Sequence, residues 1–172
     1  DPLMGDGGQR YPTYTQELCD AMGRLADGAD ILMPNLTEAS ILIGTEYPGQ
    51  DLTDPQVNEI LRNLLELGAK NVVLKGIDRS DGKLRNYVVN AQDGVDQKKE
   101  LAHEKLPFMI HGTGDTFASA LCGAVMAGRS LPQAAYIAGE FVRNSMVSTR
   151  NQPHFEERGV SFELNLKELT DL

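Results

Sequence analysis

His111-Gly112-Thr113-Gly114-Asp115-Thr116-Phe117 is the stretch of this sequence that says most about the fold. Its glycines allow backbone N–H groups to approach an anion closely, and the start of a helix adds a partial positive charge at the same place. A run of small side chains follows over residues 116–127, which we expect to be helical. The stretch therefore predicts a loop that opens a helix and points the N-terminus of this helix at an anion.

Asp115 has two interpretations. As a structural residue it caps the helix, which is favourable by about 0.5–2 kcal/mol. As a functional residue it faces the bound anion with its carboxylate. The helix behind it favours the second interpretation, because small side chains let a helix pack closely and aim its N-terminus at a ligand. These small residues are Ala118, Ser119, Ala120, Cys122, Gly123, Ala124 and Ala127.

Helical and extended segments alternate along the rest of the chain. Apolar spacing and capping residues predict helices at residues 15–25, 37–43, 54–67 and 131–150. Short apolar runs predict strands at residues 29–33, 71–75 and 84–89, the last two joined by a turn at Asp81-Gly82. Residues 104–110 are predicted to be extended, and Asn165 is predicted to cap a last helix at residues 166–172.

This alternation predicts an α/β fold with a mainly parallel sheet and helices on both faces. Ligands of such sheets bind at the carboxyl ends of the strands. Four loops follow these ends, at residues 5–8, 34–38, 75–78 and 112–115. We therefore expect them to converge on one site.

The opening motif is Asp1-Pro2-Leu3-Met4-Gly5-Asp6-Gly7-Gly8. Its carboxylates are either solvated residues of a turn or partners of a Mg²⁺-bound triphosphate, since Mg²⁺ takes one or two carboxylates together with phosphate oxygens.

A third motif is Met33-Pro34-Asn35-Leu36-Thr37-Glu38-Ala39. Pro34 forces an extended residue before it, so Asn35 and Glu38 lie just beyond a strand end. In the structural interpretation, Thr37 or Asn35 caps the following helix. In the functional interpretation, Glu38 orders a metal or its waters and Asn35 reaches a phosphate. The spacing alone does not decide between them.

Composition narrows the class of protein. The chain has 172 residues and a formal net charge of −9, which argues against a general nucleic-acid binder. No apolar run approaches the roughly 20 residues of a membrane helix, and the first residues do not look like a secretory signal. We expect Cys19 and Cys122 to be reduced, buried thiols of a cytoplasmic protein, because neither has a metal-ligand spacing.

The three motifs occur in an order that resembles the ribokinase-like superfamily and, within it, the pyridoxal kinases. The resemblance rests on Asp-Pro-x-Met-Gly-Asp at residues 1–6, Tyr11, residues 29–39, Leu42-x-Gly44, and His-Gly-Thr-Gly-Asp-x-Phe-Ala-Ser-Ala-Leu at residues 111–121. Residues 159–163 are similar to the tail of pyridoxal kinases from Gram-positive bacteria. The resemblance covers essentially the whole chain. It implies that residues 1–172 are the C-terminal part of a single ribokinase-like kinase domain whose N-terminal strands are missing.

The resemblance also implies a function. It is ATP-dependent phosphorylation of the 5′-hydroxymethyl group of pyridoxal, pyridoxine or pyridoxamine, by a cytoplasmic homodimer without nucleic-acid or membrane partners. Asp115 is then the base that takes the hydroxyl proton. The backbone amides of Gly112, Thr113 and Gly114 form the anion hole for the γ-phosphate.

The resemblance assigns further residues to ATP and its metal. Asp6 and Glu38 lie at Mg²⁺ or its waters, with a monovalent cation as a further candidate cofactor. Asn35 contacts the ATP phosphates and Asp1 lies near them. Lys75 stands where many relatives carry a small hydroxyl residue, and it either reaches a phosphate or is simply exposed.

Other readings remain open. Hydroxymethylpyrimidine kinases of thiamine synthesis share the fold, but they typically carry Cys at the position of Asp115 and lack the Gly5-Asp6 pair. Sugar and nucleoside kinases rarely carry the opening motif. An alternative outside the enzymes is a fragment that binds a nucleotide and does not catalyse a reaction. Because relatives place most pyridoxal contacts in the N-terminal part, we expect residues 1–172 alone to lack pyridoxal kinase turnover.

Overall fold

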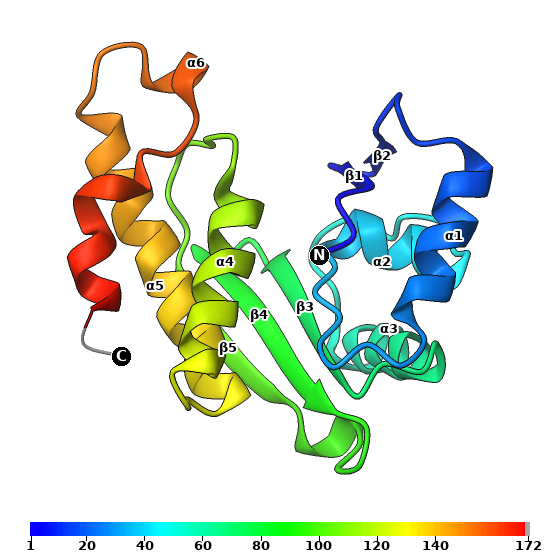
Figure 1. Cartoon of the computed structure of the whole chain (residues 1–172). Coiled ribbons are helices and arrows are strands. Elements are labelled where there is room, and N and C mark those ends of the chain that lie inside the picture. The colour runs from blue at the N-terminus through cyan, green and yellow to red at the C-terminus, as the bar shows by residue number, and fades with distance from the viewer. Residues whose placement is uncertain (171–172) are drawn as a thin grey trace. The chain divides into compact units, whose positions relative to one another are not determined.

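The computed structural model describes residues 1–170, which fall into two compact units, Asp1–Ala102 and His103–Leu172 (Figure 1). The first unit contains β1 (Gly5–Asp6), β2 (Gln9–Arg10), α1 (Gln16–Ala26), α2 (Leu36–Ile43), α3 (Asp54–Glu66), β3 (Asn71–Asp78), β4 (Lys83–Asn90), the 3₁₀ turn η1 (Val95–Gln97) and most of β5 (Lys99–Glu104). The second contains α4 (Thr113–Met126), α5 (Leu131–Arg150), α6 (Phe155–Arg158) and the 3₁₀ segment η2 (Phe162–Leu169).

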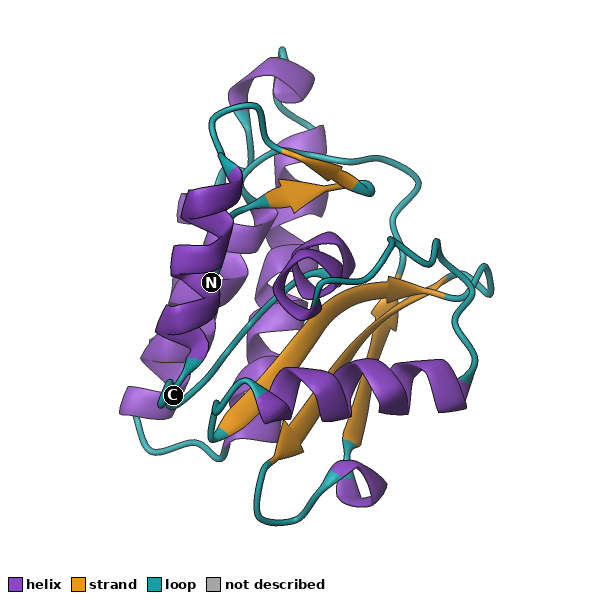
Figure 2. Cartoon of the chain, turned by 90° about the vertical axis from the view of Figure 1, so that its right-hand side faces the viewer, coloured by secondary structure: helices purple, strands orange, loops and turns teal. Residues whose placement is uncertain are grey.

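The main sheet has the order β3-β4-β5, and β1 and β2 form a separate two-stranded hairpin (Figure 2). β3 and β4 pair antiparallel from Asn71↔Asn90 to Asp78↔Leu84, which confirms the predicted hairpin. β3 is three residues longer than predicted and reaches Asp78. An irregularity between Leu74 and Ile77 contains Gly76, whose φ is 71°.

The predicted strand at residues 29–33 is much shorter than expected. This part of the chain contributes the isolated parallel bridges Leu32↔Val72 and Asn35↔Lys75 beside β3. The strand cannot extend further, because Pro34 has no N–H for a ladder and α2 begins at Leu36. The α/β class is confirmed, but β1 pairs with β2, and β3 with β4, in the antiparallel direction.

α3 anchors the core of the first unit. Its first turn is closed by Gln56, whose Oε1 accepts from the backbone N and the hydroxyl of Thr53 at 2.9 and 2.8 Å. Its apolar face packs against β3. The fully buried residues that the two elements contribute to this core cluster are Val57, Leu61, Leu64, Val72, Leu74 and Ile77. Burial of each such side chain contributes about 1.5–3 kcal/mol, so this layer is the main source of stability in the first unit.

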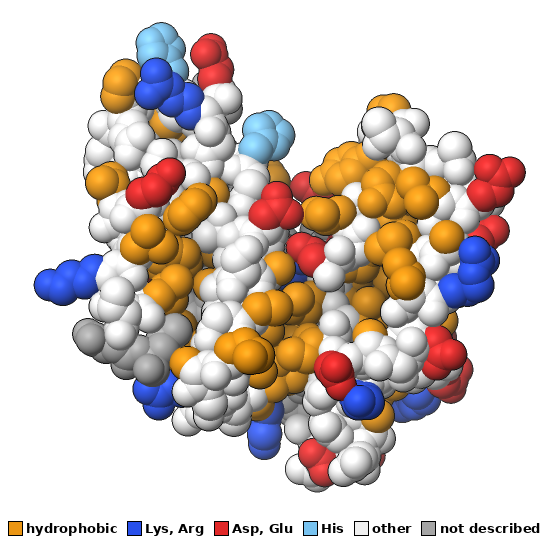
Figure 3. Space-filling model, in the orientation of Figure 1, with side chains coloured by type: hydrophobic (Ala, Val, Ile, Leu, Met, Phe, Trp, Pro, Cys, Tyr) orange, Lys and Arg blue, Asp and Glu red, His pale blue; other side chains and the backbone are white. Residues whose placement is uncertain are grey.

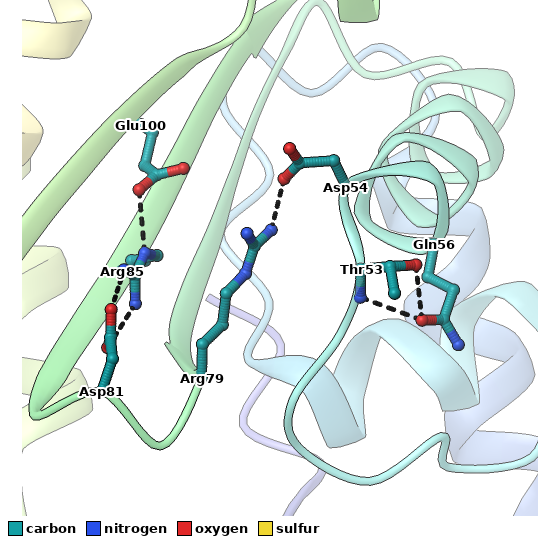
Figure 4. A network of polar contacts seen from close by, with 7 residues as sticks. All are labelled: Thr53, Asp54, Gln56, Arg79, Asp81, Arg85 and Glu100. Carbon is teal, nitrogen blue, oxygen red and sulfur yellow. Dashed lines mark hydrogen bonds and ion pairs between the residues drawn. The ribbon is translucent and has the colours of Figure 1, made fainter.

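Two arginines tie the end of the β3–β4 hairpin to its neighbours (Figure 4). Arg79 Nη2 donates to Asp54 at the start of α3, at 2.6 Å. Arg85 binds Asp81 across the turn, and its Nε donates to Glu100 of β5 at 2.8 Å. The carboxylates are exposed, so these pairs add little net stability. Their effect is to hold the hairpin in one position against α3 and β5.

α1 lies where a helix was predicted. It begins after the capping residue Thr15, as expected, but Leu18 is 42% exposed and Leu25 is 70% exposed. Figure 3 shows hydrophobic side chains gathered over β1, β2 and α1. The helix buries Cys19 and Ala26 instead. The apolar spacing therefore identified a helix correctly, although these two leucines do not lie in the core.

The second unit is built on the packing of α4 against α5 (Figure 1). Ala134, Ala135 and Ala138 of α5 are fully buried, and such small residues allow two helices to approach closely. α5 spans its predicted residues, whereas α4 begins at Thr113, three residues before the predicted start. Ser119, Cys122 and Met126 of α4 are exposed, so the expectation of a buried Cys122 is wrong.

Two other segments are shifted along the chain. The extended segment predicted at residues 104–110 overlaps with β5 at Glu104 alone, because the strand spans Lys99–Glu104 and ends before Pro107. The last helix begins earlier than predicted, as the 3₁₀ segment η2 after Ser161, and its predicted last two residues, 171 and 172, lie outside the described residues. Among the helices of the described part, none has the length and apolar character needed to cross a membrane.

His103 fills the space beside a glycine of α5. Its side chain is 6% exposed, its Nδ1 lies 2.7 Å from Glu140 Oε1, and its ring stacks on Tyr136 at 5.2 Å between centroids. A Cβ added to Gly139 would overlap this ring. Because the ring is held on two sides, it cannot move aside cheaply.

We predict that Gly139→Ala destabilises the chain by about 1–3 kcal/mol through overpacking. Gly123→Ala on α4 is the matched control, because a Cβ there meets no other group within 4 Å. The control is expected to be neutral or stabilising by about 0.4–1 kcal/mol. Urea unfolding monitored by circular dichroism measures both. Equal stability of the two variants would contradict the assigned contact.

Candidate functional site

The residues predicted to form the site fall into two groups, one in each compact unit. Asp1, Asp6, Asn35, Glu38 and Lys75 belong to the first unit. The stretch 112–115 belongs to the second unit. Each group is a connected local structure.

The hairpin β1–β2 presents Asp6 to solvent. Its two-residue turn, Gly7-Gly8, has φ values of 57° and 80°, as a type I′ turn requires. The turn leaves the Asp6 side chain exposed, with Oδ1 accepting from Gly7 N at 2.9 Å. Asp6 is therefore available to a ligand on its solvent side.

α2 is capped by Asn35 and not by Thr37. Asn35 Oδ1 accepts from Glu38 N, and Glu38 Oε2 accepts from Asn35 N at 2.8 Å, which together form a capping box. Thr37 lies inside the helix and is 4% exposed, where its Oγ1 accepts from Gly8 N at 2.8 Å. The sequence left both capping candidates open, and the longer helix, which starts at Leu36, selects Asn35.

Glu38 connects the opening motif to α2. Its Oε1 accepts from Met4 N at 3.2 Å, while the Asn35 amide donates to Gly5 O at 2.9 Å. Glu38 is 2% exposed. Burial raises the pKa of this carboxyl, and the hydrogen bonds from Asn35 and Met4 and the charge of Lys75 oppose that rise. The structural role of the third motif is thus confirmed, and its proposed metal role comes in addition to it.

Lys75 is buried, so the expectation that it is simply exposed is wrong. Its backbone N donates to Pro34 O at 2.8 Å, and its Nζ lies 2.6 Å from Asp1 Oδ1. Both side chains are 11% exposed. The ion pair joins the opening motif to β3, and it places a positive charge beside the capping box of α2.

The first group offers few carboxylate ligands for a Mg²⁺-bound triphosphate. Within the described residues there is no group of three or more His, Cys, Asp or Glu side chains placed to hold a metal ion. Mg²⁺ on a triphosphate needs only one or two protein carboxylates, which the exposed Asp6 can supply. Both Glu38 oxygens already accept from backbone amides. Glu38 is therefore better placed to order a metal-bound water than to bind the ion directly.

The second group is the start of α4. The residue before the helix, Gly112, has φ 85°, a left-handed angle that L side chains rarely adopt. Thr113, Gly114 and Asp115 form the first turn, and Thr116 closes it with its N and Oγ1 donating to Gly112 O at 3.1 and 2.8 Å. The first amides of a helix have no partner within the helix, so this end can bind an anion through its backbone.

Asp115 does not cap α4. No side chain makes a capping hydrogen bond at this helix end, and Asp115 lies in the first turn with its side chain exposed. The loop before it is fixed by Val160 N, which donates to His111 O at 2.9 Å. The purely structural interpretation of Asp115 therefore loses its main support.

The sequence did not reveal the backbone atoms that hold the first set of site residues together. Met4 N, Gly5 O and Gly8 N bind the side chains of Glu38, Asn35 and Thr37, respectively. No side-chain pattern could reveal these contacts, because any residue carries the same backbone donor and acceptor. The Asp1–Lys75 pair was missed because the two residues are 74 positions apart.

The fold and the two residue groups define an α/β protein of the ribokinase-like class. The family model described as phosphomethylpyrimidine kinase matches residues 1–158, and the chain belongs to that family. The chain is similar to a solved structure assigned to phosphomethylpyrimidine kinase from Bacteroides thetaiotaomicron, in a crystal form with pyridoxal. The TM-score is 0.90 and the sequence identity is 32%. The match covers 100% of this chain and 59% of that one.

Two curated relatives come from Bacillus subtilis. Its pyridoxine kinase is 31% identical over 148 residues, which cover 83% of this chain and 51% of the relative. Its hydroxymethylpyrimidine/phosphomethylpyrimidine kinase is 28% identical over 150 residues, which cover 87% of this chain and 53% of the relative. The chain spans between 21% and 53% of the length of the curated relatives it matches. Similar identities to the two kinases leave the substrate unresolved.

We predict that Lys75→Met destabilises the chain by about 3–5 kcal/mol, because it removes the cation that pairs with the Asp1 carboxylate, whose side chain is 11% exposed. Lys70→Met is the control, since the Lys70–Asp30 pair is 67% and 83% exposed and should contribute little. Thermal and urea unfolding of both variants check this. A loss for Lys75→Met no larger than for the control would show that the pair does not hold the opening motif.

Proposed function

We propose that this chain carries the nucleotide-binding and catalytic residues of an ATP-dependent kinase. Its substrate is the 5′-hydroxymethyl group of pyridoxal, pyridoxine or pyridoxamine, and residues 1–172 act as part of a single kinase domain. The observation that carries the proposal is the start of α4, where a left-handed glycine leads into an uncapped helix with an exposed Asp115. The similarity to a structure crystallised with pyridoxal supports this substrate class.

In this proposal the carboxylate of Asp115 accepts the proton of the substrate hydroxyl. The hydroxyl oxygen forms a bond to the γ-phosphorus, the bond from phosphorus to the β–γ bridging oxygen breaks, and ADP leaves with that electron pair. The amides of Gly112, Thr113 and Gly114 donate to the equatorial oxygens. Their contribution is electrostatic, which is the main protein contribution in phosphoryl transfer.

The first residue group binds the rest of the nucleotide. Lys75 and Asn35 contact phosphate oxygens, with Asp1 holding Lys75 in place. Asp6 supplies a carboxylate to Mg²⁺, which neutralises phosphate charge when bound, and Glu38 orders water at the metal. A monovalent cation is a further candidate in this acidic region. The limited exposure of Lys75 favours contact with a ligand that enters the site over contact with bulk solvent.

A hydroxymethylpyrimidine kinase is the second candidate function. The description of the matching family and the Bacillus subtilis relative of that activity favour it. Asp115 and the Gly5-Asp6 pair favour the vitamin B6 substrate, because the pyrimidine kinases typically carry Cys at the first position and lack the second. The two functions share the transfer chemistry and differ in the ring that is bound.

The test is a phosphoryl-transfer assay of the full-length protein with ATP, Mg²⁺ and four acceptors in parallel, namely pyridoxal, pyridoxine, pyridoxamine and hydroxymethylpyrimidine. We expect kcat/KM to be highest for a B6 vitamer. A higher value for the pyrimidine would establish the second candidate. ATP binding without transfer to any acceptor would indicate a nucleotide-binding protein.

We predict that Asp115→Asn lowers the transfer rate by about 10²–10⁴-fold and leaves ATP affinity nearly unchanged. The fold is expected to survive, because this side chain makes no capping hydrogen bond. Glu17→Gln, an exposed first-turn carboxylate of α1, is the matched control for loss of one negative charge. The measurements are steady-state kinetics and calorimetric ATP titration. Activity of Asp115→Asn within a few-fold of the control would remove Asp115 from the chemistry.

A further inference from the structure

A cavity in the first unit has no role in the proposed transfer reaction. It has a volume of about 350 Å³ and lies among the hairpin β1–β2, the start of α1 and α2. Its lining residues are Gly8, Arg10, Gln16, Thr37, Ser40, Ile41, Gly44, Thr45 and Tyr47. None of them is among the residues assigned to ATP, the metal or the base. The volume is near the lower limit of the roughly 300–1,000 Å³ of small-molecule sites.

Tyr47 and Gly8 form one wall of this cavity, and the wall is fixed in place. A Cβ added to Gly8 would lie 2.8 Å from the Tyr47 ring, so the ring packs directly on the glycine backbone. Gln50 Nε2 donates to the Tyr47 hydroxyl at 3.1 Å. Tyr47 also packs against the hydrophobic core of the unit. The cavity is therefore preformed on this side.

The floor is made of buried hydroxyl groups on α2. Thr37 and Ser40 are each 4% exposed, and the Ser40 hydroxyl already donates to Leu36 O at 2.9 Å, so the donor to a ligand on this floor is Thr37. Thr37 Oγ1 accepts from Gly8 N at 2.8 Å, which leaves its own hydrogen for another acceptor. Thr45 at the rim and the Tyr47 phenol add further O–H groups. A ligand rich in acceptor oxygens fits this set of donors.

The charge of the lining points to an anion. The chain has a formal net charge of −9, yet the cavity lining contains one arginine, Arg10, and no carboxylate. Arg10 Nη1 donates to Gln16 Oε1 at 3.2 Å, and the Gln16 amide in turn donates to Asp20 at 2.9 Å. Gln16 therefore separates the acidic side chain of Asp20 from the guanidinium. One bond to Gln16 leaves most of the five donors of the arginine for a ligand.

We propose that this cavity binds a phosphate group, either as inorganic phosphate or as a small phosphate monoester. Arginine and several hydroxyls around one cavity match the oxygens of phosphate, with which arginine forms charge-assisted, bidentate hydrogen bonds. The site is distinct from the anion-binding start of α4, because all of its residues lie in the first unit.

The test is titration of the ¹⁵N-labelled full-length protein with inorganic phosphate and, separately, with pyridoxine 5′-phosphate, followed by NMR. Saturable shifts are expected at the amides of Gly8, Ser40 and Thr45. Tighter binding of the monoester would assign the site to a phosphorylated small molecule, and equal binding would assign it to free phosphate. The absence of saturable shifts at these amides with both compounds would overturn the proposal.

Variants test whether phosphate binds in this cavity and not elsewhere on the protein. Arg10→Gln is expected to weaken phosphate binding about tenfold or more, whereas Arg24→Gln on the last turn of α1 removes the same charge outside the cavity and should leave the affinity unchanged. Thr45→Val removes a rim hydroxyl with little change in size, and we expect a smaller loss. Equal affinities of Arg10→Gln, Thr45→Val and Arg24→Gln would contradict the proposal.

Discussion

The buried carboxylate of Glu38 holds together the segments from which the first half of the site is built. It accepts from Asn35 N at the start of α2 and from Met4 N in the opening motif. Burial of a charged carboxylate is costly unless it is hydrogen-bonded or paired. Two backbone donors and the nearby charge of Lys75 offset this cost. The position of Asp6, two residues after Met4, therefore depends on an interaction inside the protein.

This arrangement shows how one motif can serve structure and chemistry together. Asn35 and Glu38 form a reciprocal capping box, which accounts for their spacing without any ligand. The same bonds direct the start of α2 and its partial positive charge toward the opening motif. Asp115 is the opposite case, because it lies in a first turn but makes no capping bond. A functional role is thus better supported for Asp115 than for Glu38.

The two anion sites that we propose, one in each unit, use different donors. The start of α4 depends on a backbone angle that glycine adopts cheaply, and its donors are amides. The cavity beside α2 depends on side chains, with Arg10 and buried hydroxyls around a wall formed by Tyr47. Amide donors suit a group whose charge changes during a reaction, because they are fixed in advance. A flexible arginine suits a ligand that binds and leaves unchanged.

Local signals in the sequence determined where most helices begin and end and which family the chain resembles. Thr15 caps α1, the Thr53–Gln56 pair opens α3, and Gly44 ends α2. These signals act within a few residues, so they can be read directly. Tertiary structure decided that Leu18 and Leu25 are exposed, that Lys75 is buried against Asp1, and that residues 29–35 contribute two isolated bridges in place of a full strand. Burial and pairing depend on partners that are far away in the sequence, and the fold alone brings those partners together.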